Sequence, residues 1–200
     1  MESSNHSLSI FPSSRLVVPL GMKIRVLSEI AVSVALAAVL DLISKSLPLP
    51  RLPYGGSVSL RMLPIVVVAW RNGWKAGVVA GGVYGSVDFL IHPIYVHPIQ
   101  LLLDYPLAFG AVGIAGGWAV AGNNGWAFHL RLLVGILLGN GLRLICHFLS
   151  GVVFFAQFAP VDQPIWLYSL MYNLTYIVPE VIILIILAQL ILRRTQSREN

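Results

Sequence analysis

Six apolar stretches, separated by short polar or proline- and glycine-rich ones, constrain this chain more than any other feature. A helix of about 20 apolar residues spans a hydrocarbon core roughly 30 Å thick. Charged residues make up 10% of the 200 residues, against about 25% in soluble domains. We therefore predict an all-α fold, a polytopic integral membrane bundle of six transmembrane helices. The helices are expected at about 24–44, 59–71, 74–92, 98–120, 130–157 and 165–192.

The second stretch is too short to cross a membrane by itself. About 12 residues rise roughly 18 Å as a helix, well under the hydrocarbon thickness. The preceding residues 47–57 are rich in proline and glycine, which prevents a regular helix. Non-helical backbone at this depth is tolerated where it is buried in protein or lines a cavity. Two interpretations remain open: an ordinary surface loop, and a lid over a pocket on the outer side.

Basic residues at the ends of the stretches predict the orientation of the bundle. Lys23 and Arg25 precede the first stretch, Arg71 and Lys75 bracket the turn after the second, and further arginines follow the last. The positive-inside rule then places both termini in the cytoplasm. Because these residues lie at span ends, the net charge of +5 does not indicate nucleic-acid binding.

The chain divides into three parts. Residues 1–21 are Ser-rich and lack a continuous apolar region, so we expect a dispensable or misassigned leader rather than a cleaved signal peptide. Residues 22–192 form the six-helix membrane domain, which we interpret as substrate-binding, and residues 193–200 form a cytoplasmic basic tail. The single cysteine excludes an internal disulfide.

Two ionisable residues lie deep inside apolar stretches. Asp104 is in the fourth stretch and His147 is in the fifth. Such groups cost several kcal/mol at bilayer depth unless they face a protein interior or a wet cavity. Aromatic residues recur at helical spacing near both, and a carboxylate with aromatic rings suits a positively charged heterocycle. We predict a pocket for a polar or cationic small molecule.

Structural roles for the same residues remain open. Asp104 can form an ion pair with Arg143, which also falls in mid-span, and His147 can be a hydrogen-bonded core histidine. Asp41, Asp88 and Glu180 are expected to be partners of Arg143 or Arg61, or span-end groups, rather than ligand contacts.

No nucleotide-binding, hydrolase or helical metal-binding motif occurs in the chain, so we expect neither an enzyme nor a cofactor or metal site. Energy for uphill transport would have to come from another polypeptide or an ion. Gly77, Gly81 and Gly85 form a small-residue stripe that we assign to packing inside the bundle. Ala31 and Ala35 form a second stripe, which fits either internal packing or a partner.

Several segments together resemble one family, the thiamine-specific S components of energy-coupling factor (ECF) transporters. The segments are LSEIAVSVA (27–35), GGSVSLRMLPI (55–65), WRNGWKAG (70–77), HPIQLLLDYPLAF (97–109), HFLSG (147–151), YSLMYN (168–173) and PE (179–180). The resemblance runs in order over residues 22–192. It implies a multi-pass protein of the bacterial cell membrane that captures thiamine from outside. It also implies docking onto an EcfT scaffold with two EcfA-type ATPases.

The resemblance also implies individual roles. Asp104 stands at the acidic ligand position, where some members have the longer glutamate, and Phe155 stands where some have a stacking tryptophan. Tyr54 is the nearest counterpart of a loop tryptophan, and Ala31 and Ala35 match a scaffold-docking A-x-x-x-A motif. The complete set of implied ligand-binding residues is Asp104, Tyr105, His147, Gly151, Phe155, Tyr168, Asn173, Tyr54 and Tyr95.

Three functional hypotheses follow. The first is a thiamine-binding subunit of an ECF-type importer. The second is a stand-alone secondary transporter or channel for another cation, or an S component for another cationic or heteroaromatic vitamin. The third is an intramembrane enzyme that uses Asp104 or Glu180 with His147. A stand-alone transporter would more often show an internal repeat, and the sequence shows none.

Overall fold

The computed structural model describes residues 20–48, 52, 56–118 and 126–196. The predicted all-α fold is confirmed: the regular structure of these residues is helical. The longer helices are α1 (Leu20–Ser46), α2 (Met62–Asn72), α3 (Trp74–Ile91), α6 (Trp126–Phe154) and α7 (Ile165–Gln196). The predicted fourth span is a chain of short elements: α4 (Pro98–Leu102), a π-helical turn (Leu103–Leu107), α5 (Ala108–Val112) and a 3-10 helix (Gly113–Trp118). A short 3-10 helix (Ala156–Phe158) follows α6.

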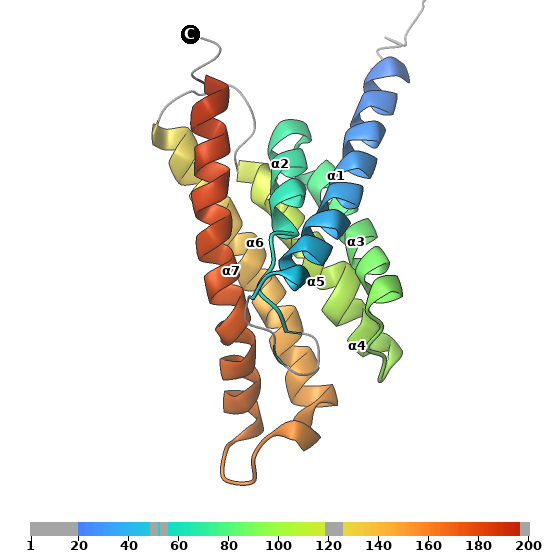
Figure 1. Ribbon diagram of the computed structural model, residues 1–200, viewed down its shortest axis with the longest axis vertical. Helices are drawn as coiled ribbons and strands as arrows, with labels where there is room; N and C mark the ends of the chain where they lie inside the picture. Colours follow the sequence, from blue (N-terminus) through green and yellow to red (C-terminus); the bar gives the residue numbers. More distant parts are fainter. Residues whose placement is uncertain (1–19, 49–51, 53–55, 119–125, 197–200) are drawn as a thin grey trace, which may run out of the picture.

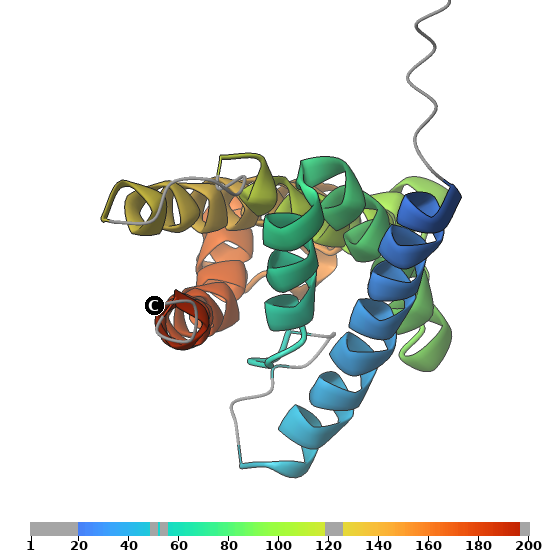
Figure 2. The same cartoon turned by 90° about the horizontal axis from the view of Figure 1, so that it is seen from above.

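The helices form an up-and-down bundle. The start of α1, the α2–α3 turn and the end of α7 lie at one end, whereas the α3–α4 and α6–α7 turns lie at the other (Figure 1). Seen along the bundle, α2 lies between α1 and α7 and contacts both (Figure 2). The apolar core lies where α2, α3, α5 and α6 meet, and it includes Ile65, Tyr84, Phe109 and Ile136. Within the described residues, four spans are long and apolar enough to cross a membrane: 23–46, 98–116, 127–154 and 165–191.

The second helix is short, as the sequence predicts. Its 11 residues extend about 16 Å, so the preceding backbone reaches into the bundle without helical hydrogen bonds. At the end of that stretch Gly56 and Ser57 are buried, as are Val58 and Ser59 that follow, whereas Leu47 and Pro48 at its start are exposed and Leu52 is half-buried. An ordinary surface loop is therefore the wrong interpretation for residues 56–59. Residues 49–51 and 53–55, which include Tyr54, lie outside the described residues.

The glycine stripe of α3 packs inside the bundle, as predicted. A Cβ atom on Gly81 would lie 2.1 Å from the Phe109 carbonyl oxygen, and one on Gly85 would lie 2.5 Å from that of Tyr105. A Cβ on Gly77 would similarly meet the Gly113 carbonyl oxygen at 2.4 Å. Because backbone is on the other side of each contact, α3 and the fourth span touch main chain to main chain. This contact sets the position of the segment that carries Asp104.

We expect Gly81→Ala to destabilise the bundle, because the added methyl group meets a backbone carbonyl that no rotamer change can move. Overpacking of this kind costs about 1–3 kcal/mol or more, so the thermal unfolding midpoint in detergent should fall by several degrees. Gly82→Ala is the matched control, since the nearest atom to its Cβ is 3.9 Å away. Equal unfolding midpoints for the two variants would contradict the close contact.

Candidate functional site

A cavity of about 310 Å³ opens among the non-helical segment before α2, α3, the fourth span, α6 and α7. This volume is at the lower end of the range of small-molecule sites, about 300–1,000 Å³. The predicted ligand-binding residues that line it are Asp104, Tyr105, His147, Gly151, Phe155, Tyr168 and Asn173. Tyr95 lies in the α3–α4 turn, is 59% exposed and does not line the cavity. Tyr54 lies outside the described residues.

The π-helical turn presents Asp104 and Tyr105 to the cavity. A π turn is a local widening that inserts an extra residue and is frequent at functional sites. Pro106 lies inside this turn and has no N–H to donate to the preceding turn. The hydroxyl of Tyr105 donates to the His92 carbonyl at 2.9 Å and accepts from the Ile94 N–H at 3.0 Å. These bonds join the π-helical turn to the α3–α4 connection. They therefore fix the backbone position from which Asp104 and Tyr105 enter the cavity.

The carboxylate of Asp104 is surrounded by hydrogen-bond donors. Its Oδ2 accepts from Gln100 Nε2 at 2.8 Å and from Ser150 Oγ at 2.7 Å. Its Oδ1 lies 3.1 Å from His147 Nδ1. The expected alternative, an ion pair with Arg143, is wrong: Arg143 Nη1 lies 2.7 Å from Glu180 Oε2 instead. In the part of the chain that the structure describes, no arginine or lysine nitrogen lies within 4.0 Å of Asp104.

The hydrogen bonds of His147 determine which ring nitrogen carries the proton. Arg143 Nε has only hydrogen to offer, so His147 Nε2 accepts from it, in a long bond of 3.4 Å. The proton is then on Nδ1, which donates to Asp104. His147 is therefore a neutral donor in this arrangement, and the negative charge of Asp104 is not cancelled by it.

The other acidic groups at this depth are paired with basic side chains. Arg61 Nη1 lies 3.3 Å from Asp41 Oδ1 and 3.4 Å from Asp88 Oδ2. Its Nε lies 3.8 Å from Glu180 Oε1, which also belongs to the carboxylate that pairs with Arg143. The prediction that these three acids are partners of the two arginines is confirmed. Asp104 thus differs from them in having no arginine or lysine partner among the described residues.

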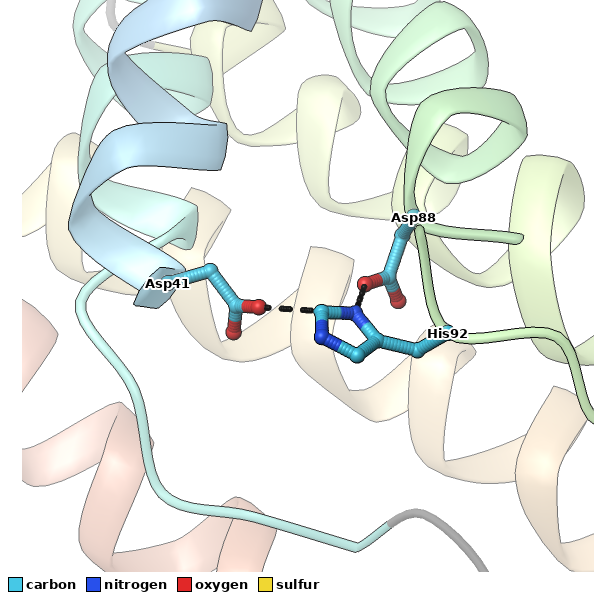
Figure 3. A group of neighbouring side chains, drawn as sticks. All are labelled: Asp41, Asp88 and His92. Atoms are coloured by element: carbon cyan, nitrogen blue, oxygen red, sulfur yellow. Dashed lines mark hydrogen bonds and ion pairs between the residues drawn. The ribbon is translucent and has the colours of Figure 1, made fainter. Parts of the chain in front are cut away.

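Asp41, Asp88 and His92 form a group whose ligand atoms all lie within 4.8 Å of one another (Figure 3). Carboxylate oxygens and an imidazole nitrogen suit a divalent metal. Lys45 Nζ, however, lies 2.7 Å from Asp41 Oδ2 and 2.9 Å from His92 Nε2. Arg61 also contacts both aspartates. Lys45 and Arg61 thus supply the positive charge that a metal ion would otherwise bring to this group. The group joins α1 to α3 at the edge of the cavity.

Aromatic residues of α7 form one wall of the cavity. The rings of Tyr168 and Tyr172 have centroids 6.1 Å apart, and those of Tyr172 and Tyr176 are also 6.1 Å apart. Tyr176 Oη donates to Asn173 Oδ1 at 2.7 Å, and Asn173 Nδ2 donates to the Ser169 carbonyl at 2.8 Å. The Gly56 N–H donates to Tyr172 Oη at 3.2 Å, so this wall also holds the buried non-helical segment.

Gly151 has a different role from the one the sequence suggests. Its spacing from His147 and Phe155 predicts that it opens space beside the histidine. A Cβ atom at this position would instead lie 2.2 Å from Ser169 Oγ, which donates to the Phe148 carbonyl at 2.9 Å. The missing side chain therefore lets α6 and α7 approach each other at the edge of the cavity.

Sequence reasoning missed two polar residues that contact Asp104, namely Gln100 and Ser150. Both have a signal in the sequence, because Gln100 precedes Asp104 by four residues on the same helical face. Ser150 likewise follows His147 by three residues on α6. The docking candidates Ala31 and Ala35 are exposed on α1 beside Val32, which is 66% exposed, and they do not line the cavity.

Comparison with known proteins identifies the family. Residues 27–199 match the family described as "Thiamine transporter protein (Thia_YuaJ)". The thiamine transporter ThiT of Bacillus subtilis is 42% identical over 165 residues, which cover 78% of this chain and 84% of that protein. The thiamine transporter ThiT of Lacticaseibacillus paracasei is 35% identical over 127 residues, 56% of this chain and 61% of that protein.

A solved structure of ThiT from Listeria monocytogenes has the same fold, with a TM-score of 0.76 at 25% identity. The match covers 88% of this chain and 97% of that one. The hypothesis of an intramembrane enzyme is wrong, because the relatives are transporters. The protein is a multi-pass protein of the bacterial cell membrane, and the chain belongs to the thiamine transporter (Thia_YuaJ) family.

Proposed function

We propose that this protein is the membrane-embedded thiamine-binding subunit, or S component, of an ECF-type importer. The observation that carries the proposal is the unpaired charge of Asp104. Glu29, Asp41, Asp88 and Glu180 each have an arginine or lysine nitrogen within 4.0 Å. Asp104, of the carboxylates in the described helices, has none. A lone carboxylate at this depth is costly without a positive partner, and a cationic ligand would supply one.

Thiamine has the chemistry that this cavity would recognise. It joins a permanently cationic thiazolium ring to an aminopyrimidine ring, so it presents a charge, amino donors and two flat faces. The carboxylate of Asp104 complements the charge, and the rings of Phe155 and Tyr168 line the same cavity. Aromatic faces attract cations by about 0.5–2 kcal/mol each. The names of the relatives, thiamine transporters, support the same ligand.

The ECF association and the orientation belong to the same proposal. Both ends of the membrane domain and the α2–α3 turn lie at one end of the bundle (Figure 1). Lys23, Arg25, Arg71 and Lys75 belong to that end, which we propose faces the cytoplasm with both termini. The exposed Ala31 and Ala35 on α1 would then dock onto an EcfT scaffold that carries two EcfA-type ATPases.

The ligand that co-purifies with the protein tests the proposal against its alternatives. The purified protein is denatured, and the released small molecule is identified by mass. We expect unmodified thiamine, since a binding subunit returns its ligand unchanged. A different cationic or heteroaromatic vitamin would favour another specificity. Thiamine uptake by the chain alone in proteoliposomes, without ATPases, would favour a stand-alone secondary transporter.

We expect Asp104→Asn to weaken thiamine binding about 10- to 100-fold, because the amide keeps the shape but removes the charge. Isothermal titration calorimetry on detergent-purified protein measures the change. Asp162→Asn, in the exposed α6–α7 turn, is the matched control and should bind like the wild type. An unchanged affinity in Asp104→Asn would return Asp104 to a structural role.

If Ala31 and Ala35 are docking residues, substitutions there should abolish uptake without affecting thiamine binding. A tryptophan at Ala31 or Ala35 would block close helix approach without touching the cavity. We expect Ala31→Trp and Ala35→Trp to abolish ATP-driven thiamine uptake in cells and co-purification of the scaffold, while the isolated protein still binds thiamine. Leu138→Trp, on the exposed face of α6, is the control and should support uptake. Wild-type uptake by both alanine variants would remove the docking hypothesis.

A further inference from the structure

Gln100 is a fully buried amide that connects Asp104 to the α3–α4 turn. Its exposed fraction is 0%. Its Nε2 donates to Asp104 Oδ2 at 2.8 Å and to the Ile94 carbonyl at 3.2 Å, and its Oε1 accepts from the Val96 N–H at 3.0 Å. The amide group of Gln100 therefore makes these three hydrogen bonds out of contact with water.

The backbone of the turn determines which way this amide points. The Val96 N–H is a donor and needs the oxygen of Gln100 opposite it. A flipped amide would put that oxygen against the Ile94 carbonyl and the Asp104 carboxylate, which are both acceptors. The orientation is thus unique, and the turn guarantees that Gln100 offers a donor to Asp104.

Ser150 completes the environment of the same oxygen. It is 1% exposed, and its hydroxyl donates to Asp104 Oδ2 at 2.7 Å from α6. With the neutral His147 donating to Oδ1, Asp104 accepts three hydrogen bonds, one from α4 and two from α6. Three donors around the two carboxyl oxygens stabilise a carboxylate, because hydrogen bonds to a charged acceptor are stronger than those to a neutral one.

We propose that Gln100 and Ser150 are positioning residues that hold Asp104 as a fixed countercharge, and that through it they set the preference of the site for a cationic over a neutral ligand. This inference rests on the proposed function, thiamine binding. The two donors bond Oδ2, and no lysine or arginine nitrogen of the described residues lies within 4.0 Å of the carboxylate. The charge of Asp104 is thereby stabilised without being cancelled, and the ligand supplies the cancelling charge.

The test compares two ligands on two variants. The probes are thiamine and its neutral analogue with a thiophene ring in place of the thiazolium, which has the same aminopyrimidine. We expect Gln100→Met and Ser150→Ala each to weaken thiamine binding by about tenfold or more. Binding of the neutral analogue should change less than about threefold, because it does not use the charge. In an Asp104→Asn background the same two substitutions should add little.

Matched controls separate this role from general packing. Gln189→Met removes a glutamine amide that bonds His129 at the far end of the bundle, and Ser86→Ala removes an exposed hydroxyl of α3. Both should bind the two ligands like the wild type. Ser150→Ala leaves the α3–α4 turn untouched, so it decides the question even when Gln100→Met fails to fold.

The outcomes are distinct. Equal losses for thiamine and for the neutral analogue would overturn the inference, since they indicate a structural role. Unchanged thiamine binding in Ser150→Ala would overturn it as well. Failure of the wild-type protein to bind thiamine would instead overturn the proposed function, which the wild-type titration reports separately.

Discussion

The pairing of buried charges is the constraint on which the rest of this bundle depends. Arg143 and Arg61 lie at membrane depth with exposed fractions of 0% and 4%, where an unpaired charge is very costly. Their partners Asp41, Asp88 and Glu180 come from three different helices, α1, α3 and α7. These ion pairs therefore decide which helix faces must meet. Because Asp41, Asp88 and Glu180 are paired with arginines, they are not expected to contact the ligand. Asp104, which has no arginine or lysine partner among the described residues, is the carboxylate expected to do so.

The short second helix follows from the same requirement. Arg61 immediately precedes α2, and it can reach its partners because the backbone before it enters the bundle without helical turns. The polar backbone of this segment still needs partners in a dry environment. Tyr172 accepts from the Gly56 N–H, and Ser44 of α1 accepts from the Leu60 N–H at 3.1 Å. The irregular segment, the arginine and the cavity wall are thus one unit.

The apolar runs of the sequence predict the helices, and the ionisable residues within those runs predict a cavity beside Asp104 and His147. The other predicted lining residues come from the family resemblance. The sequence does not assign partners. Arg143 has acids available in the fourth span and in α7, and only the three-dimensional packing selects Glu180 over Asp104. The sequence does not predict the π-helical turn either. Pro106 indicates that the helix is disturbed there, but it does not indicate that the disturbance is a π-helical turn. Gly151 fits both an open space and a close helix contact, and the facing Ser169 decides between them.

The two sides of α1 connect this helix to both proposed activities, ligand binding and docking onto the scaffold. Its buried side carries Asp41, which pairs with Arg61, and Arg61 Nη2 in turn donates to Ser57 Oγ at 3.4 Å in the segment that lines the cavity. Its opposite side carries the exposed Ala31 and Ala35. A helix moves largely as a rigid body, so a shift of the cavity segment that changes the Asp41–Arg61 contact would also displace the alanine face. If α1 docks onto the scaffold, the Asp41–Arg61 ion pair is a physical connection between the cavity segment and the docking helix.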